Sequence, residues 1–289
     1  MTRDRIIARR GRPGVTETIV RRSFTRRGSF MSRLRPCIDI HNGKVKQIIG
    51  SSLRDEGESA AENFVAGESA ASYASLFRRH DLRGGHVILL NKEGSPHYEE
   101  TKAAAKEALA AWPGGLMAGG GITADNAAMW IDAGASHVIV TSYVFSGGQI
   151  REDALRRISE AVGREHLVLD LSSRQKEAGG AYYIMTDRWQ HYTDTPLDEA
   201  LMEKLSGFAS EFLVHGIAVE GKGSGIDAGL VELLSAFAKT RHFPVTYAGG
   251  IRSLADIREI ETVSGGCVDY TVGSALDIYG GSLPLASLV

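Results

Sequence analysis

Two stretches of this 289-residue chain decide its fold: residues 247–277, YAGGIRSLADIREIETVSGGCVDYTVGSALD, and residues 118–145, AGGGITADNAAMWIDAGASHVIVTSYVF. Each begins with glycines, passes through a segment with helical patterning, and ends with a small-residue turn and a β-branched run. Gly121 aligns with Gly250 at an offset of 129 residues, and Thr141 aligns with Gly273 at an offset of 132. A unit that recurs at about half the chain length indicates a duplicated half rather than a solenoid, whose repeats are ~20–50 residues long.

The glycines in both copies predict anion sites. Each Gly-Gly-Ile follows an apolar run, where a strand would end and a helix would begin. Glycine lets a ligand approach the main chain closely, and the N–H groups at a helix start attract anions. A single glycine pair is more often only a turn, but here each copy adds a second polar loop at the next strand end. We predict two phosphate sites on one face, formed by Gly120, Gly121, Thr141 and Ser142 in the first copy and by Gly249, Gly250, Gly273 and Ser274 in the second.

Apolar runs separated by helical segments predict the fold class. Strands are expected near residues 35, 86, 115, 137, 167, 212, 244 and 268, with a helix after nearly every one. Continuous apolar runs are typical of parallel strands that are buried on both faces. Eight βα units in residues 34–289 match the ~250 residues of a closed eight-stranded (βα)8 TIM barrel. We therefore predict a single α/β barrel domain over 34–289, built from two half-barrels; a doubly wound open sheet is the alternative.

Four further local predictions follow from turn and helix signals. Asn42-Gly43 predicts a tight turn into a second strand, KVKQIIG. Residues 51–67 are polar and predict a loop, and residues 181–185 predict a small extra strand. Pro196 is expected to open a helix that ends at Gly207, because proline suits a first helical turn.

Composition and charge restrict the function classes. A formal charge of −2 gives no reason to expect nucleic acid as a partner, and no apolar run approaches the ~18 residues of a membrane span. The two cysteines, Cys37 and Cys267, are too few for a disulfide framework or a cysteine-rich metal site, and they suit a reducing compartment. We expect a monomer that acts on a small molecule, without membrane or nucleic-acid partners.

Residues 1–30 differ in composition from the rest of the chain. They contain nine arginines and only two acidic residues, Asp4 and Glu17. Arginine-rich, acid-poor leaders resemble organelle transit peptides, and the alternative is an over-long start with Met31 as the initiator. We predict that residues 1–33 are a disordered extension outside the barrel. The protein is then cytoplasmic, or organellar if residues 1–30 are a genuine transit peptide.

Two aspartates stand at equivalent strand ends. Asp39 ends RPCIDI and Asp170 ends HLVLDL, 131 residues apart, which agrees with the repeat offset. The active site of such barrels lies at the carboxyl ends of the strands. A lone aspartate there is more often a loop cap. A symmetric pair between two phosphate sites instead predicts general acid–base catalysis on a substrate with two phosphates. This requires that the environments of the two aspartates separate their pKa values.

Other polar residues follow the same strand ends. His41, Asn91, Lys92, Ser172, His215 and Glu220 are predicted at the mouth of the barrel. His215 is the best candidate among the histidines, since its strand ends close to Asp170. The residues do not assemble a metal site, so no metal is expected. Cys37 is interpreted as barrel packing and 221–225, GKGSG, as a flexible active-site loop.

Taken together, these motifs resemble a known family. RPCIDIHNGKVKQI, HLVLDLS, GGGI, AGGIRS and VGSAL resemble the phosphoribosylformimino-5-aminoimidazole carboxamide ribotide isomerases of histidine biosynthesis, and VEGKGSGID resembles their eukaryotic-type branch. The resemblance implies a duplicated barrel without cofactor that converts an aminoaldose (ProFAR) to an aminoketose (PRFAR) by an Amadori rearrangement. It further implies that Asp39 is the base that takes the C2 proton and that Asp170 is the acid that helps the ribose ring to open.

The chain departs from the common bacterial pattern at the sixth strand. That pattern has Thr-Asp and then Asp-Gly-Thr, whereas this chain has His215-Gly216 and then Glu220-Gly221-Lys222. His215 therefore stands where the resemblance places an assisting threonine. The first glycine loop also has Thr123 where the second copy has Arg252.

Three alternatives remain open at this stage. The first is the cyclase of the same pathway, also a duplicated barrel, which consumes ammonia. The second is a non-catalytic barrel that binds a phosphorylated metabolite, against which the paired aspartates argue. The third is additional activity on an analogue from the tryptophan pathway.

Overall fold

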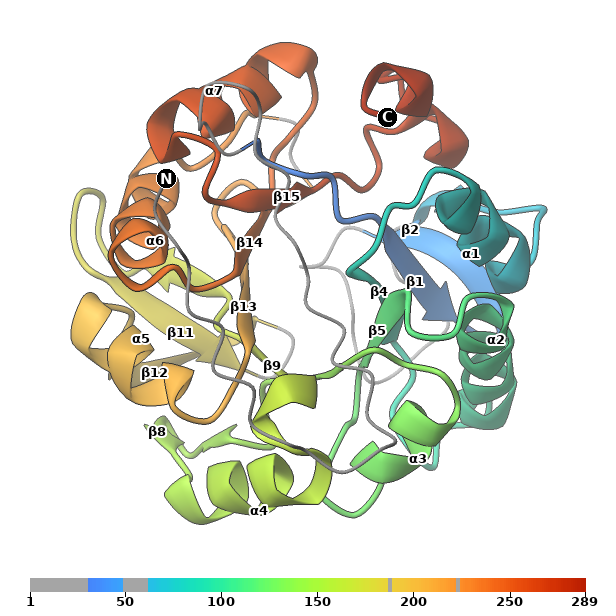
Figure 1. Ribbon diagram of the computed structural model, residues 1–289, viewed down its shortest axis with the longest axis horizontal. Helices are drawn as coiled ribbons and strands as arrows, with labels where there is room; N and C mark the ends of the chain where they lie inside the picture. The colour runs from blue at the N-terminus through green and yellow to red at the C-terminus, as the bar shows by residue number, and fades with distance from the viewer. Residues whose placement is uncertain (1–30, 49–61, 187–188, 222–223) are drawn as a thin grey trace, which may run out of the picture.

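The computed structural model describes residues 31–48, 62–186, 189–221 and 224–289. The N-terminal extension predicted over 1–33 therefore lies outside the described residues except for its last three positions, and Lys222 and Gly223 of the GKGSG loop lie outside them as well. Figure 1 shows strands arranged around a central region, with helices on the outside. Among the described residues, no helix has the length and hydropathy that a membrane crossing requires.

The described residues contain one curved ten-stranded sheet and two small ones. The large sheet has the order β15-β14-β13-β9-β6-β5-β4-β1-β2-β3, in which β2 and β3 are antiparallel and the other eight strands run parallel. Its strands are β1 (Cys37–His41), β2 (Lys44–Ile48), β3 (Glu62–Val65), β4 (Gly85–Leu89), β5 (Leu116–Gly119), β6 (Val138–Val140), β9 (Leu167–Asp170), β13 (Glu211–His215), β14 (Val245–Ala248) and β15 (Asp269–Thr271). These eight parallel strands are the eight predicted from the sequence.

Helices follow the strands as the periodicity predicts. The α-helices are α1 (Ala70–Arg79), α2 (Tyr98–Ala111), α3 (Ala127–Asp132), α4 (Glu152–Val162), α5 (Glu199–Ser206), α6 (Ala228–Arg241) and α7 (Leu254–Ser264). Short 3-10 helices span η2 (Arg164–His166), η3 (Asp277–Tyr279) and η4 (Leu285–Ser287). The small sheets are β7 (Phe145–Ser146) with β8 (Gln149–Ile150), and β10 (Ser173–Gln175) with β11 (Tyr182–Thr186) and β12 (His191–Pro196).

The turn and hairpin predictions have mixed outcomes. The Asn42-Gly43 turn is confirmed: both residues have positive φ angles, of 52° and 70°, and β1 pairs with β2 across them. The extra strand near residues 181–185 is confirmed as β11, which pairs with strands on both sides. The loop predicted over 51–67 is wrong at 62–65, which form β3 on the edge of the sheet beside β2, and its first part, 51–61, lies outside the described residues.

The predicted start of the helix at Pro196 is also wrong. Pro196 is the last residue of β12 and pairs with Tyr183, so it ends a hairpin strand. Helix α5 begins three residues later, where the Asp198 side chain caps it by accepting a hydrogen bond from the Leu201 N–H at 2.8 Å. Proline suits both positions, because a strand end and a first helical turn can each lack an N–H donor.

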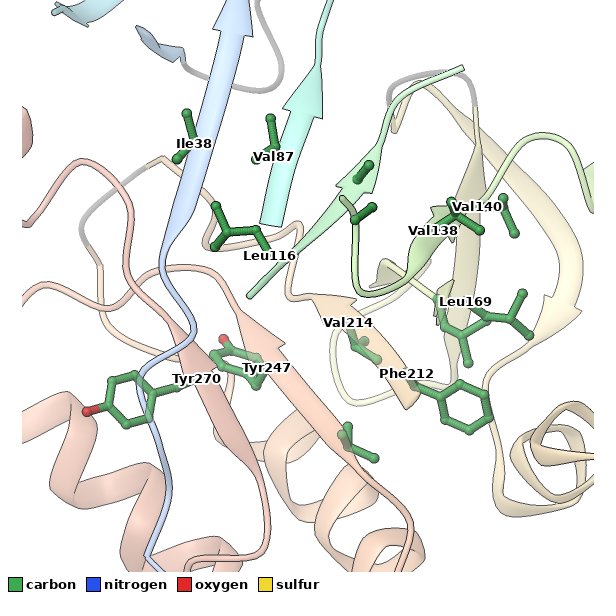
Figure 2. Close-up of a cluster of buried hydrophobic side chains, with 14 of the residues drawn as sticks. Ile38, Val87, Leu116, Val138, Val140, Leu169, Phe212, Val214, Tyr247 and Tyr270 are labelled. Carbon is green, nitrogen blue, oxygen red and sulfur yellow. The ribbon is translucent and has the colours of Figure 1, made fainter. Parts of the chain in front are cut away.

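The parallel strands are buried on both faces. Outward side chains such as Leu169 and Phe212 pack under the helices in one large core, part of which Figure 2 shows. Inward side chains from five strands form a second, smaller cluster, comprising Met117, Ile139, Val168, Leu213 and Ala248. Because side chains alternate along a strand, each strand contributes inward residues at successive heights. In β13 these are Glu211, Leu213 and His215, in that order.

A buried ion pair joins the segment before β1 to β15. The Arg35 Nη2 lies 2.7 Å from an Asp269 carboxylate oxygen, and the Arg35 Nε also donates to Asp269, at 2.9 Å. The main chain is bonded at the same place, where Leu34 forms a parallel bridge with Tyr270. Burial alone would lower the pKa of Arg35, but the carboxylates of Glu211 and Asp269 outweigh it and raise that pKa.

We expect Asp269→Asn to lower the free energy of unfolding by about 3 kcal/mol, since it leaves the buried Arg35 cation short of a counter-charge. Asp125→Asn is the matched control, because it breaks the exposed pair with Arg157 and should cost less than about 1 kcal/mol. Urea unfolding measures both. Equal losses in the two variants would show that the buried pair does not hold the sheet.

Candidate functional site

A cavity of about 850 Å³ opens at the carboxyl ends of the parallel strands. It is lined by inward residues of the sheet and by the loops that follow the strands. Every residue predicted for the site lines it, namely Asp39, Asp170, His215, Gly120, Gly121, Thr141, Ser142, Gly249, Gly250, Gly273 and Ser274. Three strands separate β1 from β9 in the sheet, so the sheet must curve strongly for Asp39 and Asp170 to line one cavity.

The two glycine loops have the same backbone conformation. Gly120 and Gly249 have φ angles of 94° and 118°, and Gly121 and Gly250 have φ angles of 67° and 73°. These left-handed values favour glycine. At Gly120 the reason is also steric, because an added Cβ would lie 2.1 Å from the Leu89 carbonyl oxygen. The repeat seen in the sequence is therefore matched by the conformation of both loops.

The second loops of the two copies also correspond. After β6, Thr141 is partly buried and Ser142 is exposed; after β15, Gly273 is partly buried and Ser274 is exposed. Each loop is closed by a turn hydrogen bond to the carbonyl of its first residue. The Val144 N–H donates to the Thr141 carbonyl and the Leu276 N–H donates to the Gly273 carbonyl, both at 3.0 Å. The cavity is also lined by two cationic residues, Lys92 and Arg252.

Asp170 and His215 form one hydrogen-bonded unit through Ser172. The Ser172 main-chain N–H donates to Asp170 Oδ1 at 2.8 Å, and the Ser172 hydroxyl donates to the same oxygen. That hydroxyl lies 3.0 Å from His215 Nδ1, which is itself 4.0 Å from Asp170 Oδ1. Ser172, predicted at the mouth, lies fully buried behind the cavity wall and orients the two residues that face it.

The environments of the two aspartates move their pKa values in opposite directions. Burial raises the pKa of Asp39 to about 7; Glu220 adds to the rise and His215 opposes it. Burial would also raise the pKa of Asp170, but its bonds to His215 and Ser172 hold that pKa below its ordinary value. For His215, burial lowers the pKa, and the Asp170 partner more than offsets this, so the net pKa is raised.

Two residues that the sequence analysis gave no role also face this group. Trp189 has a positive φ of 63°, and its ring centroid lies 5.1 Å from that of His215. Glu220 lines the cavity, and burial raises its pKa, opposed by His215. Among the other predicted mouth residues, Asn91 and Lys92 line the cavity, whereas His41 is buried and does not.

The fold and this cavity define the class of protein, an α/β protein with a polar site at the carboxyl ends of a curved parallel sheet. The family described as "Histidine biosynthesis protein" matches residues 33–284. The chain therefore belongs to that family.

Curated relatives agree over most of the chain. The chain is 52% identical over 261 residues to a chloroplastic protein of Medicago truncatula, covering 89% of this chain and 80% of the relative. That relative is named 1-(5-phosphoribosyl)-5-((5-phosphoribosylamino)methylideneamino) imidazole-4-carboxamide isomerase. Two relatives of the same name are 43% identical in Neurospora crassa, covering 87% of this chain and 94% of the relative, and 39% identical in Saccharomyces cerevisiae, covering 88% and 95%.

The link between Asp170 and His215 can be measured directly. In Asp170→Asn the burial of His215 acts without its charged partner, so we expect the pKa of His215 to fall below the ordinary ~6.5. Nitrogen–proton NMR of the imidazole rings measures this. His137, whose pKa burial lowers to about 4, is the internal control and should not move. An unchanged His215 pKa would contradict the coupling.

Proposed function

We propose that this chain is the isomerase that converts ProFAR to PRFAR in histidine biosynthesis. The observation that carries the proposal is the 52% identity with a relative of that name, over 89% of the chain. The paired aspartates and paired glycine loops in one cavity support it, because a long substrate with a phosphate at each end needs two anion sites with acid–base groups between them.

We infer that the parallel sheet closes into an eight-stranded barrel of the TIM type, formed by a duplicated half-barrel in a single domain over 34–289. The hydrogen bonds from the Arg35 N–H to the Tyr270 carbonyl, at 2.8 Å, and from the Tyr270 N–H to the Arg33 carbonyl, at 3.0 Å, support the closure. The matching φ angles of the glycine loops support the duplication.

Each phosphate of the substrate binds one pair of loops in this proposal. The first site combines the glycine loop after β5 with Thr141 and Ser142, and the second combines the glycine loop after β14 with Gly273 and Ser274. Main-chain N–H groups and hydroxyls are the expected donors. Lys92 and Arg252 add positive charge at the cavity wall.

Asp39 is the proposed base and the Asp170–His215 pair is the proposed acid. His215, with its raised pKa, carries the proton, and the Asp170 carboxylate holds the imidazolium in place. The proton passes to the ribose ring oxygen as the bond from that oxygen to C1 breaks, leaving an open-chain iminium. Asp39 then removes the C2 proton to give an enaminol. The enaminol gains a proton at C1 and loses its C2 hydroxyl proton, which yields the aminoketose. The resemblance assigns the acid role to Asp170; the low pKa of Asp170 favours His215 as the donor.

The alternatives are less well supported. The cyclase and the non-catalytic barrel share the fold, but the relatives at 39–52% identity carry the isomerase name. Complementation of a histidine auxotroph that lacks only the isomerase tests the assignment. For residues 1–30, the chloroplastic name of the Medicago relative supports the transit-peptide interpretation, and with it an organellar location, over a late start at Met31.

We expect Asp39→Asn and Asp170→Asn each to lower kcat at least ~10²-fold, the scale of general acid–base catalysis. Purified protein is assayed by coupling the product to the cyclase with ammonia. Asp81→Asn, at an exposed aspartate that pairs with Arg83 in the loop before β4, at the end of the sheet away from the cavity, should keep normal turnover. Near-normal turnover in both site variants would falsify the catalytic assignment and favour the non-catalytic barrel.

The pH profile tests the base. Asp39 must be ionised to accept a proton, so kcat/KM should rise with pH through about 7 and be lost as pH falls below that value. At higher pH it should fall again, once His215 loses the proton that its raised pKa retains. The assay contains a chelator to remove trace metals. Glu220→Gln removes a neighbouring charge that raises the Asp39 pKa. The midpoint of the rise in kcat/KM should therefore move to lower pH in this variant. A midpoint that stays in place would assign the titration to another group.

A further inference from the structure

Three side chains of different chemistry meet at the base of the cavity. Cys37 and Asp39 are two residues apart on β1 and so lie on the same face of the strand, toward the cavity. His86 lies on the neighbouring strand β4, directly opposite Cys37 in the register of the parallel pair. The Cys37 sulfur, an Asp39 carboxylate oxygen and an imidazole nitrogen of His86 all lie within 4.8 Å of one another.

This set of donors is the one that zinc prefers. Zn²⁺ takes thiolate, imidazole and carboxylate ligands in a tetrahedron, with bonds of about 2.0–2.3 Å, so its ligand atoms lie about 3.3–3.8 Å apart. Side-chain rotations that move the ligand atoms by about 1 Å would bring the three atoms to those separations. A thiolate and a carboxylate together balance the double charge of the ion, and a neutral imidazole completes the set.

The surroundings favour a cation at some of these groups and oppose it at another, because burial raises the pKa of the Cys37 thiol well above its ordinary value and so disfavours the thiolate in the absence of a metal. Burial lowers the pKa of His86 to about 3, so the imidazole is neutral and keeps a lone pair. The Cys37 sulfur has only long contacts, at 3.9 Å to the Gln47 amide and at 3.9 Å to the Val272 carbonyl. The nearby carboxylates of Asp170 and Glu220 favour a cation, while His215 opposes one.

We propose that Cys37, Asp39 and His86 form a binding site for a thiophilic divalent cation such as Zn²⁺ at the base of the cavity. The three residues supply three ligands, and the fourth position opens toward the cavity, where water would complete the tetrahedron. Binding displaces the Cys37 thiol proton to solvent. Mg²⁺, which requires oxygen ligands in an octahedron, does not fit this set.

The site would act as an inhibitory switch, a consequence that rests on the proposed function. The ion occupies the Asp39 carboxylate, which is the proposed base, so a zinc-loaded molecule could not accept the C2 proton. The binding itself is independent of turnover, because it needs only the three side chains and their positions.

Cobalt spectroscopy tests the site without substrate. We expect Co²⁺, added to the full-length metal-free protein, to give a thiolate-to-cobalt charge-transfer band that saturates at one ion per chain and is abolished by excess Zn²⁺. Cys37→Ser should lose the band, and Cys267→Ser, the matched control for the second buried thiol, should keep it. No such band in the unmodified protein, or the same band in Cys37→Ser, would overturn the proposal.

Zinc affinity provides the second measurement. Competition with a chromogenic chelator should show that His86→Gln and Asp39→Asn each weaken Zn²⁺ binding at least ~10-fold. Urea unfolding of each variant identifies one that has lost its fold, and the His86→Gln and Asp39→Asn results are read independently of Cys37→Ser. Unchanged affinity in folded His86→Gln would contradict the site. If zinc binds as expected but Asp39→Asn retains turnover, the metal site stands and the proposed function fails.

Discussion

The arrangement of the site depends on the buried pair between Arg35 and Asp269. It joins the chain just before the first strand to the last parallel strand, at the end of the sheet away from the cavity. With this edge held, the loop after β15 lies at the same mouth as Asp39, only four residues beyond Arg35. Burying the Arg35 charge at this end costs desolvation energy, and the nearby carboxylates of Asp269 and Glu211 offset that cost.

Because side chains alternate along each strand, the inward side chains of the sheet form distinct layers. Inward positions carry charged groups at one end, an apolar cluster in the middle, and aspartates and a histidine at the other. In the layer that lines the cavity, the pKa of Asp39 is raised and that of Asp170 is lowered, because only Asp170 has His215 as a close charged partner and accepts hydrogen bonds from Ser172. A pair of acids with separated pKa values can divide the tasks of base and acid.

The strands and glycine loops could be predicted from sequence because their signals are local. Apolar runs, Asn42-Gly43 and the repeated Gly-Gly pairs each depend on a few neighbouring residues. The errors at 62–65 and Pro196 arise where pairing with the preceding strand, rather than the pattern of the segment itself, decides the outcome. The same holds for His86, which lies within an apolar strand. Its place opposite Cys37 depends on the register of two strands that are far apart in the chain.

Trp189 and Ser172 show a different limit. Ser172 follows Asp170 closely in sequence, but its contact with His215 spans 43 residues, and only the pairing of β9 with β13 brings them together. The position of Trp189 depends on a left-handed residue at a hairpin end, where a bulky side chain is uncommon. No pattern in the surrounding residues indicates that its ring faces His215.

The contact between these two rings has an optical consequence. An indole beside an imidazole loses fluorescence when the imidazole gains a charge, because the cation accepts an electron from the excited ring. Of the three tryptophans, Trp112 and Trp130 are buried in the main core, so Trp189 alone stands in such a contact within the described residues. The molecule therefore carries an intrinsic reporter whose emission follows the charge on His215, without any attached dye.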